Sequence, residues 1–267
     1  MPSYVALSKT AHRHAGLRPA GYAHALSQTV VPLTAEELPH VLSTMVTGFI
    51  LPPEGGGYQL VALQSLHAGV NLYVHTNGRW IAGYQPAWYR AQPFRLLPDS
   101  QTGKLVLCVD ESAETFTSHA AEDAVRLFDD DGEPADITRK TMGFLENLHR
   151  GTETTRAAVT QLADAGLITP WALKVATTAA VAPQPVQGLY HIDEAALQAL
   201  PGDTLAELAT SGALMIAYAQ LMSEHRLKML TKLYELREEA DKQAGAARDV
   251  DLEDLFGDDD DDLSFNF

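Results

Sequence analysis

A pair of adjacent carboxylates, Asp110 and Glu111, is the first place in the sequence where chemistry could occur. Paired carboxylates act as general acid and general base when burial separates their pKa values. Together with His75 and Arg79 they could form the site of an enzyme, or enzyme subunit, that acts on a peptide. The two acids could equally lie at the end of a strand for solvation alone. No residue is therefore assigned a catalytic role.

Three histidines near the N-terminus, His12, His14 and His24, could instead bind a metal ion. A His-x-His spacing on a strand places both imidazoles on one face, which suits zinc or copper. The alternative is an extended polar arm over residues 1–25. We expect the polar arm, because three ligands beside a terminus are a poor basis for a site, and we expect no metal or cofactor.

The usual catalytic signatures are missing from the sequence. It has no Gly-x-Ser-x-Gly elbow, phosphate-binding loop, Gly-x-Gly-x-x-Gly, His-Glu-x-x-His or Cys-x-x-Cys motif. The single cysteine, Cys108, lies in the apolar run 105–109, which is typical of a small core residue. A reactive thiol would need a basic and partly exposed setting. These features favour a protein without enzymatic activity, with the carboxylate site as the alternative.

Aromatic and arginine side chains alternate between residues 79 and 95, where two of the three tryptophans occur. The aromatic block, as we call this group of candidate binding residues, consists of Arg79, Trp80, Tyr84, Trp88, Tyr89, Arg90 and Phe94, with Arg95 directly after it. Rings and guanidinium groups can bind a peptide or ligand through stacking and cation–π contacts. They can equally form a core in which the polar ends of the rings are satisfied.

The sequence ends in DLEDLFGDDDDDLSFNF, over residues 251–267. Residues 249–267 carry nine acids and no base, so we expect residues 246–267 to be disordered in isolation. The apolar side chains of this tail could enter the grooves of a protein partner. We predict this docking role for Leu255, Phe256, Leu263, Phe265 and Phe267. The alternative is a solubilising tail that folds back on its own domain.

The formal net charge of −16 is concentrated in this tail. Without the nine tail acids, 26 of the 35 acids face 19 bases, so residues 1–248 carry a net charge of −7. An acidic surface argues against nucleic acid and against unassisted binding to anionic lipid. The sequence has no apolar run of about 18 residues and no signal-peptide pattern, so we expect no membrane span and a cytoplasmic location.

The first half of the chain has the apolar runs of β-strands. Strands are predicted over residues 27–31, 45–51, 58–63, 94–97 and 104–109. Asn77-Gly78, flanked by alternating runs, predicts a hairpin with a two-residue type I′ turn. Thr34 and Glu37 form a capping-box pattern, and Pro39 should keep the following helix short.

The second half has helical periodicity. A helix is predicted over residues 138–165, with a break at Gly151 and a C-cap at Gly166. Strands are predicted within 167–178 and 186–192, and Asp193 should cap a short helix. The longest predicted helix spans 213–243; its start, 213–222, should be deeply buried. Its predicted core-facing positions are Leu214, Tyr218, Leu221, Met222, Met229, Leu233 and Leu236.

These elements predict an α+β fold. We expect one domain over residues 1–245, with a mostly antiparallel, β-rich N-terminal half and C-terminal helices, followed by the acidic tail. The sheet-rich half should be covered by the helices. No internal repeat is visible in the sequence.

The aromatic block also carries a family resemblance. The order Asn-Leu-Tyr-Val at 71–74, Gly-Arg-Trp at 78–80, Gly-Tyr-Gln-Pro-Ala at 83–87, then Arg90 and Pro93-Phe94, resembles the SapC family, named from a surface-layer protein locus in bacteria. Shorter matches follow in order over most of residues 10–235. The chain departs from the family pattern at 90–92, where a paired arginine and a tyrosine would stand, and at 43–49, so it resembles a divergent member.

The resemblance implies an accessory role. Members are associated with surface-layer secretion loci and with outer-membrane transport gene neighbourhoods, and the resemblance supplies no catalytic residues. We expect a non-enzymatic SapC-like accessory protein that binds a protein or peptide partner through the aromatic block, the tail or both. The alternatives are the peptide-acting enzyme with a site near His75, Asp110 and Glu111, and a structural subunit of a larger assembly.

Overall fold

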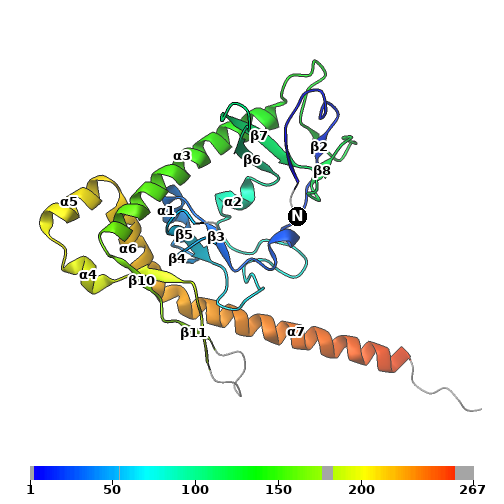
Figure 1. Cartoon of the computed structure of the whole chain (residues 1–267). Coiled ribbons are helices and arrows are strands. Elements are labelled where there is room, and N and C mark those ends of the chain that lie inside the picture. Colours follow the sequence, from blue (N-terminus) through cyan, green and yellow to red (C-terminus); the bar gives the residue numbers. More distant parts are fainter. Residues whose placement is uncertain (1–2, 54, 176–182, 256–267) are drawn as a thin grey trace, which may run out of the picture.

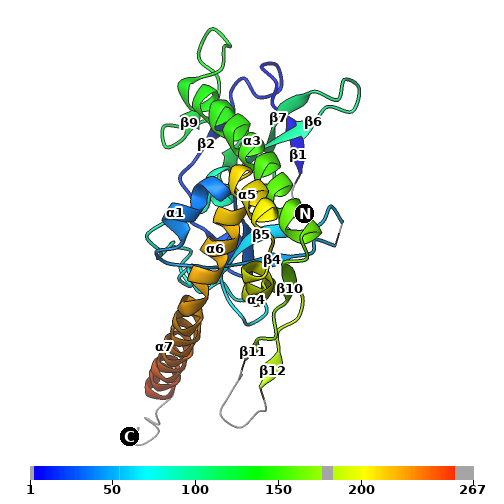
Figure 2. The ribbon, with the colours of Figure 1, turned by 90° about the vertical axis from the view of Figure 1, so that its left-hand side faces the viewer.

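The computed structural model describes residues 3–53, 55–175 and 183–255, with the side chains of the last helix as far as Gln243 (Figures 1 and 2). Antiparallel sheets fill the N-terminal half, and helices dominate the C-terminal half. The predicted α+β class, β-rich first and helical later, is therefore confirmed.

The larger sheet has five antiparallel strands in the order β10-β13-β4-β5-β3. The strands are β3 Val30–Pro32, β4 Val46–Ile50, β5 Gln59–Leu63, β10 Ile168–Pro170 and β13 Tyr190–Ile192. β4 lies in the centre, where its apolar run is buried on both faces. Phe49 of β4 pairs with Leu60 of β5 and with Tyr190 of β13. The two halves of the chain thus share one sheet.

A second sheet pairs the N-terminus with later strands in the order β1-β7-β6. Its strands are β1 Tyr4–Ala6, β6 Phe94–Pro98 and β7 Leu105–Asp110. Two smaller ladders join β2 Gly16–Leu17 with β8 Phe116–Thr117 and β9 Val125–Arg126, and β11 Lys174–Val175 with β12 Gln184–Pro185. The expected polar arm over residues 1–25 is wrong, because β1 covers an edge of β7 that would otherwise be unpaired.

The helical segments lie on several sides of the sheets (Figure 1). They are η1 Ala23–Ala25, η2 Ala35–Glu37, α1 Leu38–Val41, α2 Ala87–Arg90, α3 Asp136–Asp164, α4 Glu194–Gln198, α5 Gly202–Thr210, α6 Ala213–Ser223, η3 Glu224–Arg226 and α7 Leu227–Leu255. α3 packs Val159 and Leu162 into the core of the larger sheet, whereas its Leu145 packs with Phe94 in a separate, smaller core. α3 therefore connects the two cores.

Two glycines were predicted to interrupt or end α3, and the structure agrees at one of them. The predicted break at Gly151 does not occur; α3 is continuous, and an added Cβ at Gly151 would stand 3.4 Å from Thr34 and Glu36. A residue without a side chain leaves η2 room to pack closely against α3 there. The predicted C-cap is confirmed, because Gly166 has φ +70° and its N–H donates to the carbonyl of Ala163 at 2.9 Å.

The predicted capping box is confirmed and has wider consequences. Glu37, only 5% exposed, accepts hydrogen bonds from the Thr34 N–H at 2.9 Å and the Thr34 hydroxyl at 3.2 Å through one oxygen. Its other oxygen accepts from the Tyr84 hydroxyl at 3.1 Å and the Ala87 N–H at 2.7 Å. One carboxylate thus joins the segment after β3 to the start of α2.

The hairpin predicted at Asn77-Gly78 is a turn of a different length. The Gly78 N–H donates to the carbonyl of His75 at 2.8 Å, and the His75 N–H donates to the carbonyl of Arg79 at 2.9 Å. With Gly78 at φ +81°, this is the pattern of a three-residue loop. The flanking runs make only a single bridge, between Val74 and Trp80, and no strands.

The face predicted for residues 213–243 is partly wrong. Of the predicted core-facing positions, Tyr218, Met222, Met229 and Leu236 are exposed, as is Met215 in the stretch expected to be deeply buried. The helix also turns at η3 before continuing as α7. The buried side of α6 carries polar groups instead: Gln220 accepts from the Ile192 N–H at 2.9 Å, and Ser223 accepts from the Thr47 N–H at 2.9 Å. These side chains satisfy strand backbone that an apolar face would leave unpaired.

The length and apolar character of these helices bear on whether one could span a membrane. Among the described residues, no single helix is long and apolar enough to cross a membrane. Two consecutive helical stretches, Gly202–Thr210 and Ala213–Gln243, are long and apolar enough only when they are taken together, and the chain bends by 92° between them.

Replacing Glu37 with glutamine should lower the free energy of unfolding by about 3 kcal/mol, because charged hydrogen bonds are lost and buried donors are left unsatisfied. Urea denaturation measures the change. The matched control is Glu36→Gln at the exposed neighbouring position, which should stay within about 0.5 kcal/mol of the wild type. Equal losses in the two variants would contradict the role given to Glu37.

The carboxyl group of Asp110 should make the stability of the protein depend on pH. Burial raises the pKa of its carboxyl, but hydrogen bonds from Ser112 and Ser3 outweigh burial and hold the pKa below its ordinary value. A lowered folded-state pKa stabilises the protein above the ordinary pKa of about 4, and this stabilisation is lost as the pH falls. Asp110→Asn should therefore lower the thermal midpoint at about pH 7, with a smaller difference at about pH 3.

The control for this prediction is Asp131→Asn, at an exposed position, which should change the midpoint little at either pH. An Asp110→Asn difference that stayed constant, or grew, as the pH fell would contradict the assignment.

Candidate functional site

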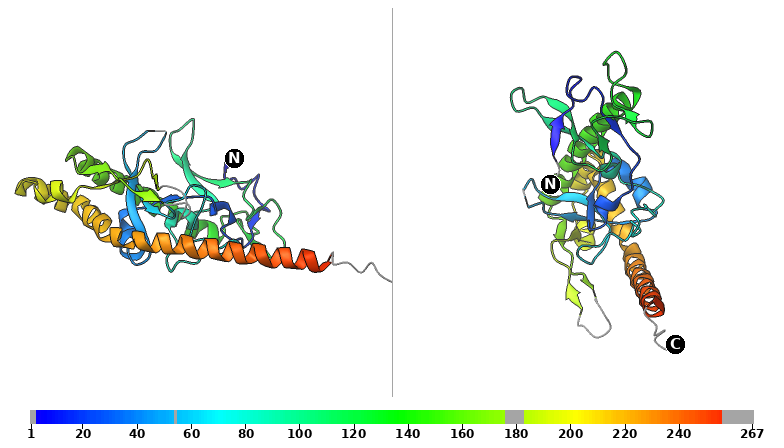
Figure 3. Two further views of the ribbon diagram at one scale, coloured as in Figure 1. Left: turned by 90° about the horizontal axis from the view of Figure 1, so that it is seen from below. Right: turned by 90° about the vertical axis from the view of Figure 1, so that its right-hand side faces the viewer.

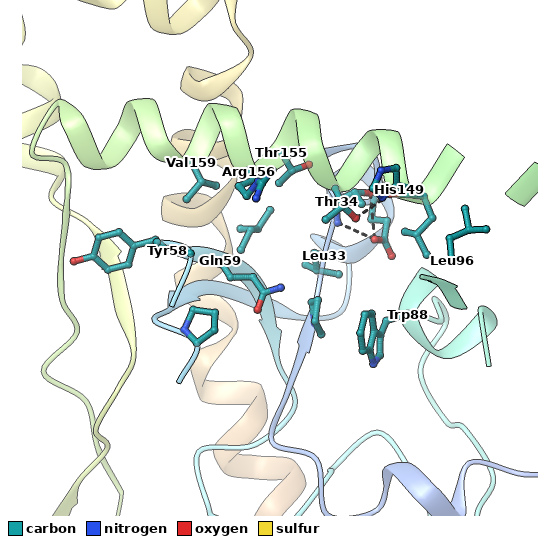
Figure 4. Close-up of a pocket in the computed structure, with 18 of the residues that line it drawn as sticks. Leu33, Thr34, Tyr58, Gln59, Trp88, Leu96, His149, Thr155, Arg156 and Val159 are labelled. Atoms are coloured by element: carbon teal, nitrogen blue, oxygen red, sulfur yellow. Dashed lines mark hydrogen bonds between the residues drawn. The ribbon is translucent and has the colours of Figure 1, made fainter. Parts of the chain in front are cut away.

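A cavity of about 360 Å³ lies between α3 and the edges of the two larger sheets (Figure 4). α3 supplies one wall, including His149, Thr155, Arg156 and Val159. The opposite wall comes from the segment after β3 with Leu33 and Thr34, from the start of β5 with Tyr58 and Gln59, and from Trp88 and Leu96. The cavity therefore lies at the junction of the two cores, a place where ligand sites commonly form.

Trp88 and Arg95 form the most distinctive pair in this cavity. Pro86 precedes α2 and sets its first turn, so that Trp88 lies 36% exposed while the adjacent Tyr89 is buried. The Arg95 guanidinium carbon stands 3.8 Å from the centre of the Trp88 ring. One of its nitrogens donates to the carbonyl of Phe94 at 3.0 Å. Stacking thus fixes the planar cation at the cavity wall.

Arg95 has no counter-charge at contact distance. Among the described residues, no carboxylate oxygen forms an ion pair with its guanidinium. Burial lowers the pKa of Arg95, while the charges of Tyr4 and Asp110 act in the opposite direction. Arginine remains charged at neutral pH. A partly buried cation without a partner is costly, so an anionic group that entered the cavity would be stabilised.

The other charged groups of the cavity are already paired or exposed. Both carboxylate oxygens of Glu37 accept hydrogen bonds from Thr34, Tyr84 and Ala87. Arg156 pairs with Glu153 on α3, and His149 is exposed on the same helix. The cavity therefore combines an apolar wall with a cationic side, and Arg95 is the cation that lacks a partner in the described part of the chain.

The aromatic block is divided by the fold. Tyr89 and Phe94 are 2% exposed and belong to the cores. The Tyr89 hydroxyl lies 2.7 Å from Gln64 Oε1, and burial raises its pKa. Trp80 is half-buried and donates its indole N–H to the carbonyl of Tyr84 at 3.1 Å. Both sequence interpretations thus apply, to different members of the block.

Of the remaining members, Arg79 and Arg90 are exposed and Tyr84 is half-buried. Arg90 is exposed, and its guanidinium stands 5.6 Å from the Tyr84 ring and 5.1 Å from the Phe144 ring. Burial, with a smaller contribution from Glu37, raises the pKa of Tyr84 to about 12. Arg79 is exposed in the turn beside Trp80, away from the cavity lining. Trp88 is thus the member of the block that lines the cavity.

The residues of the alternative enzyme site are divided between two places. The His75 ring accepts the Asn77 N–H at 3.2 Å inside its own turn. Glu111 instead lies 3.1 Å from the His12 ring, at the end of β7. Within the described residues, no hydrogen bond or ion pair joins His75 or Arg79 to Asp110 or Glu111.

The N-terminal histidines have separate neighbours. His12 is 3% exposed and accepts the Ser8 N–H at 3.0 Å, His14 stacks on His119, and His24 packs against Tyr22 and Tyr89. The part of the chain that the structure describes contains no cluster of three or more His, Cys, Asp or Glu side chains suited to a metal ion.

Cys108 was expected to be a small core residue. Cys108 is 5% exposed and burial raises the pKa of its thiol, so the expectation of a core residue is confirmed.

The tail residues Phe256, Leu263, Phe265 and Phe267 lie outside the described residues, as does the side chain of Leu255. Their docking role stays a prediction.

Comparison with known proteins gives one positive finding. The family model described as SapC matches residues 7–230 of the 267. No curated protein and no solved structure matches the chain. The matched region includes the whole aromatic block and every described residue of the cavity wall. Because the match covers well over half of the sequence, the chain belongs to the SapC family.

Proposed function

We propose that this SapC-family protein is a non-enzymatic binding protein whose cavity beneath α3 takes an acidic segment of a protein partner. The supporting observation is Arg95, a partly buried cation that stacks on Trp88 at 3.8 Å and has no carboxylate partner among the described residues. A carboxylate from a partner would supply the missing charge.

The size and lining of the cavity favour a side chain of a peptide over a larger ligand. Its volume of about 360 Å³ is at the lower end of the range for small-molecule sites. Leu33, Leu96 and Val159 offer apolar contacts, so one apolar side chain can enter while a neighbouring acid approaches Arg95. A short sequence such as an aromatic or leucine residue flanked by Asp or Glu has this chemistry.

Other parts of the functional proposal rest on the sequence and the family. The tail residues Leu255, Phe256, Leu263, Phe265 and Phe267 would dock into a protein partner. An accessory role, linked to surface-layer secretion or outer-membrane transport, rests on the family's associations alone, and a cytoplasmic location rests on the sequence alone. The cavity and the tail could contact the same partner or different ones.

Binding of defined peptides tests the proposal. The probes are labelled pentapeptides with a central Phe or Leu flanked by Asp and Glu, and the same peptides flanked by Lys, measured by fluorescence anisotropy. We expect acid-flanked peptides to bind more tightly. Arg95→Met keeps the apolar stem on Trp88 but removes the charge, and it should weaken binding about tenfold or more, as expected when one partner of a desolvated charge pair is removed.

The matched control is Arg150→Met, an exposed arginine on α3 that does not line the cavity. It should leave binding unchanged. Trp88→Ala should weaken both peptide classes, since it removes stacking area and not charge. Equal affinity for acid-flanked and Lys-flanked peptides, or equal effects of Arg95→Met and Arg150→Met, would overturn the proposal.

A further inference from the structure

A line of long apolar side chains lies exposed on α6 and α7, separate from the cavity. Met215, Met222, Met229 and Leu236 are 51%, 65%, 45% and 51% exposed. They recur every seven residues, close to two helical turns, so Met215 and Met222 share one side of α6, and Met229 and Leu236 share one side of α7. Large apolar side chains exposed on one side of a helix mark an interaction site in many proteins.

Another side of α7 is already fixed to the body. The ring of Tyr234 stacks on that of His67 with centres 3.5 Å apart, and Arg237 donates to the carbonyl of Val74 at 3.0 Å. Leu230 is buried in the larger core on the same side. The apolar line cannot turn inward without breaking these contacts. α7 extends past the sheets as a single long helix (Figure 3).

Charges along this outer face change sign from one end to the other. Lys228 and Lys232 lie one turn apart beside Met229, and Glu235 and Glu239 lie one turn apart beside Leu236, two turns further along the helix and just before Lys242. All four charged residues are exposed, and none forms an ion pair with another described residue. The face is therefore basic first and acidic later, with apolar side chains in between.

We infer that this face binds a second copy of the chain, with the two α7 helices antiparallel. Met229 then lies against Leu236 of the second copy, and the lysine pair lies opposite the glutamate pair. A parallel arrangement would place like charges side by side, whereas an antiparallel one satisfies both ends through a single two-fold axis. The chain's own acidic tail is a poorer occupant, because its nine acids would be repelled by Glu235 and Glu239.

Charge reversal tests the pairing in the full chain by sedimentation equilibrium. Lys228→Glu with Lys232→Glu, and separately Glu235→Lys with Glu239→Lys, should each raise the dimer dissociation constant about tenfold or more, because like charges then face each other. An equimolar mixture of the two variants should regain dimers, since both ends of the mixed pair are again opposite in sign. Circular dichroism confirms that each variant is folded.

A matched control and a direction probe complete the test. Lys104→Glu with Lys140→Glu changes the same charge at exposed positions elsewhere and should leave association unchanged. For direction, a mixture of Met229→Cys and Leu236→Cys proteins should form the mixed disulfide in preference to either homodimer, since a disulfide needs Cα atoms within about 7 Å.

Three results would overturn the inference: a monomeric wild type at every concentration, variants that associate as the wild type does, or a preference for homodimeric disulfides. If the wild type were monomeric but a version ending at Leu255 formed dimers, the tail would be the occupant of this face.

Discussion

The buried carboxylate of Glu37 is the interaction on which the candidate site depends. It accepts hydrogen bonds from Thr34, Tyr84 and Ala87, which lie in segments far apart in the sequence. Ala35, in the same turn as Glu37, donates its backbone N–H to the Thr155 hydroxyl on α3 at 2.8 Å. The Glu37 side chain thus holds η2 against the start of α2, and the Ala35 N–H holds η2 against α3. These contacts place the wall that carries Trp88.

The cavity follows from the way in which α3 connects two cores. Its Val159 packs with the five-stranded sheet, its Leu145 packs with the three-stranded sheet, and the space between the two packings is left open. Gly151 allows η2 to approach α3 at the same level. Arg95 reaches this space from β6 and remains without an ion-pair partner in the described residues, which gives a mostly apolar cavity one unneutralised charge.

Local features were predictable from the sequence, and features that need distant contacts were not. The capping box at Thr34, the C-cap at Gly166 and the cap at Asp193 depend on neighbouring residues, and all three are confirmed. α3 continues through Gly151 beside residues that are more than one hundred positions away in the sequence. The buried side of α6 is polar because it meets strand backbone. Of the cavity, Trp88 was within reach of sequence reasoning because it lies in the aromatic block. His149 and Arg156 were not, because charges on a long helix look like a solvated face.

The measurement that most directly tests the central claim is a nuclear magnetic resonance titration that observes the side-chain N–H groups of Arg95 and Trp88. An acid-flanked Phe pentapeptide is added to the full chain labelled with nitrogen-15. The account predicts that the Arg95 Nε–H and Trp88 indole signals shift together and saturate with the peptide, while the indole signal of the half-buried Trp80 stays in place. Binding that shifts the Trp80 and Arg79 signals and leaves Arg95 and Trp88 unchanged would contradict it.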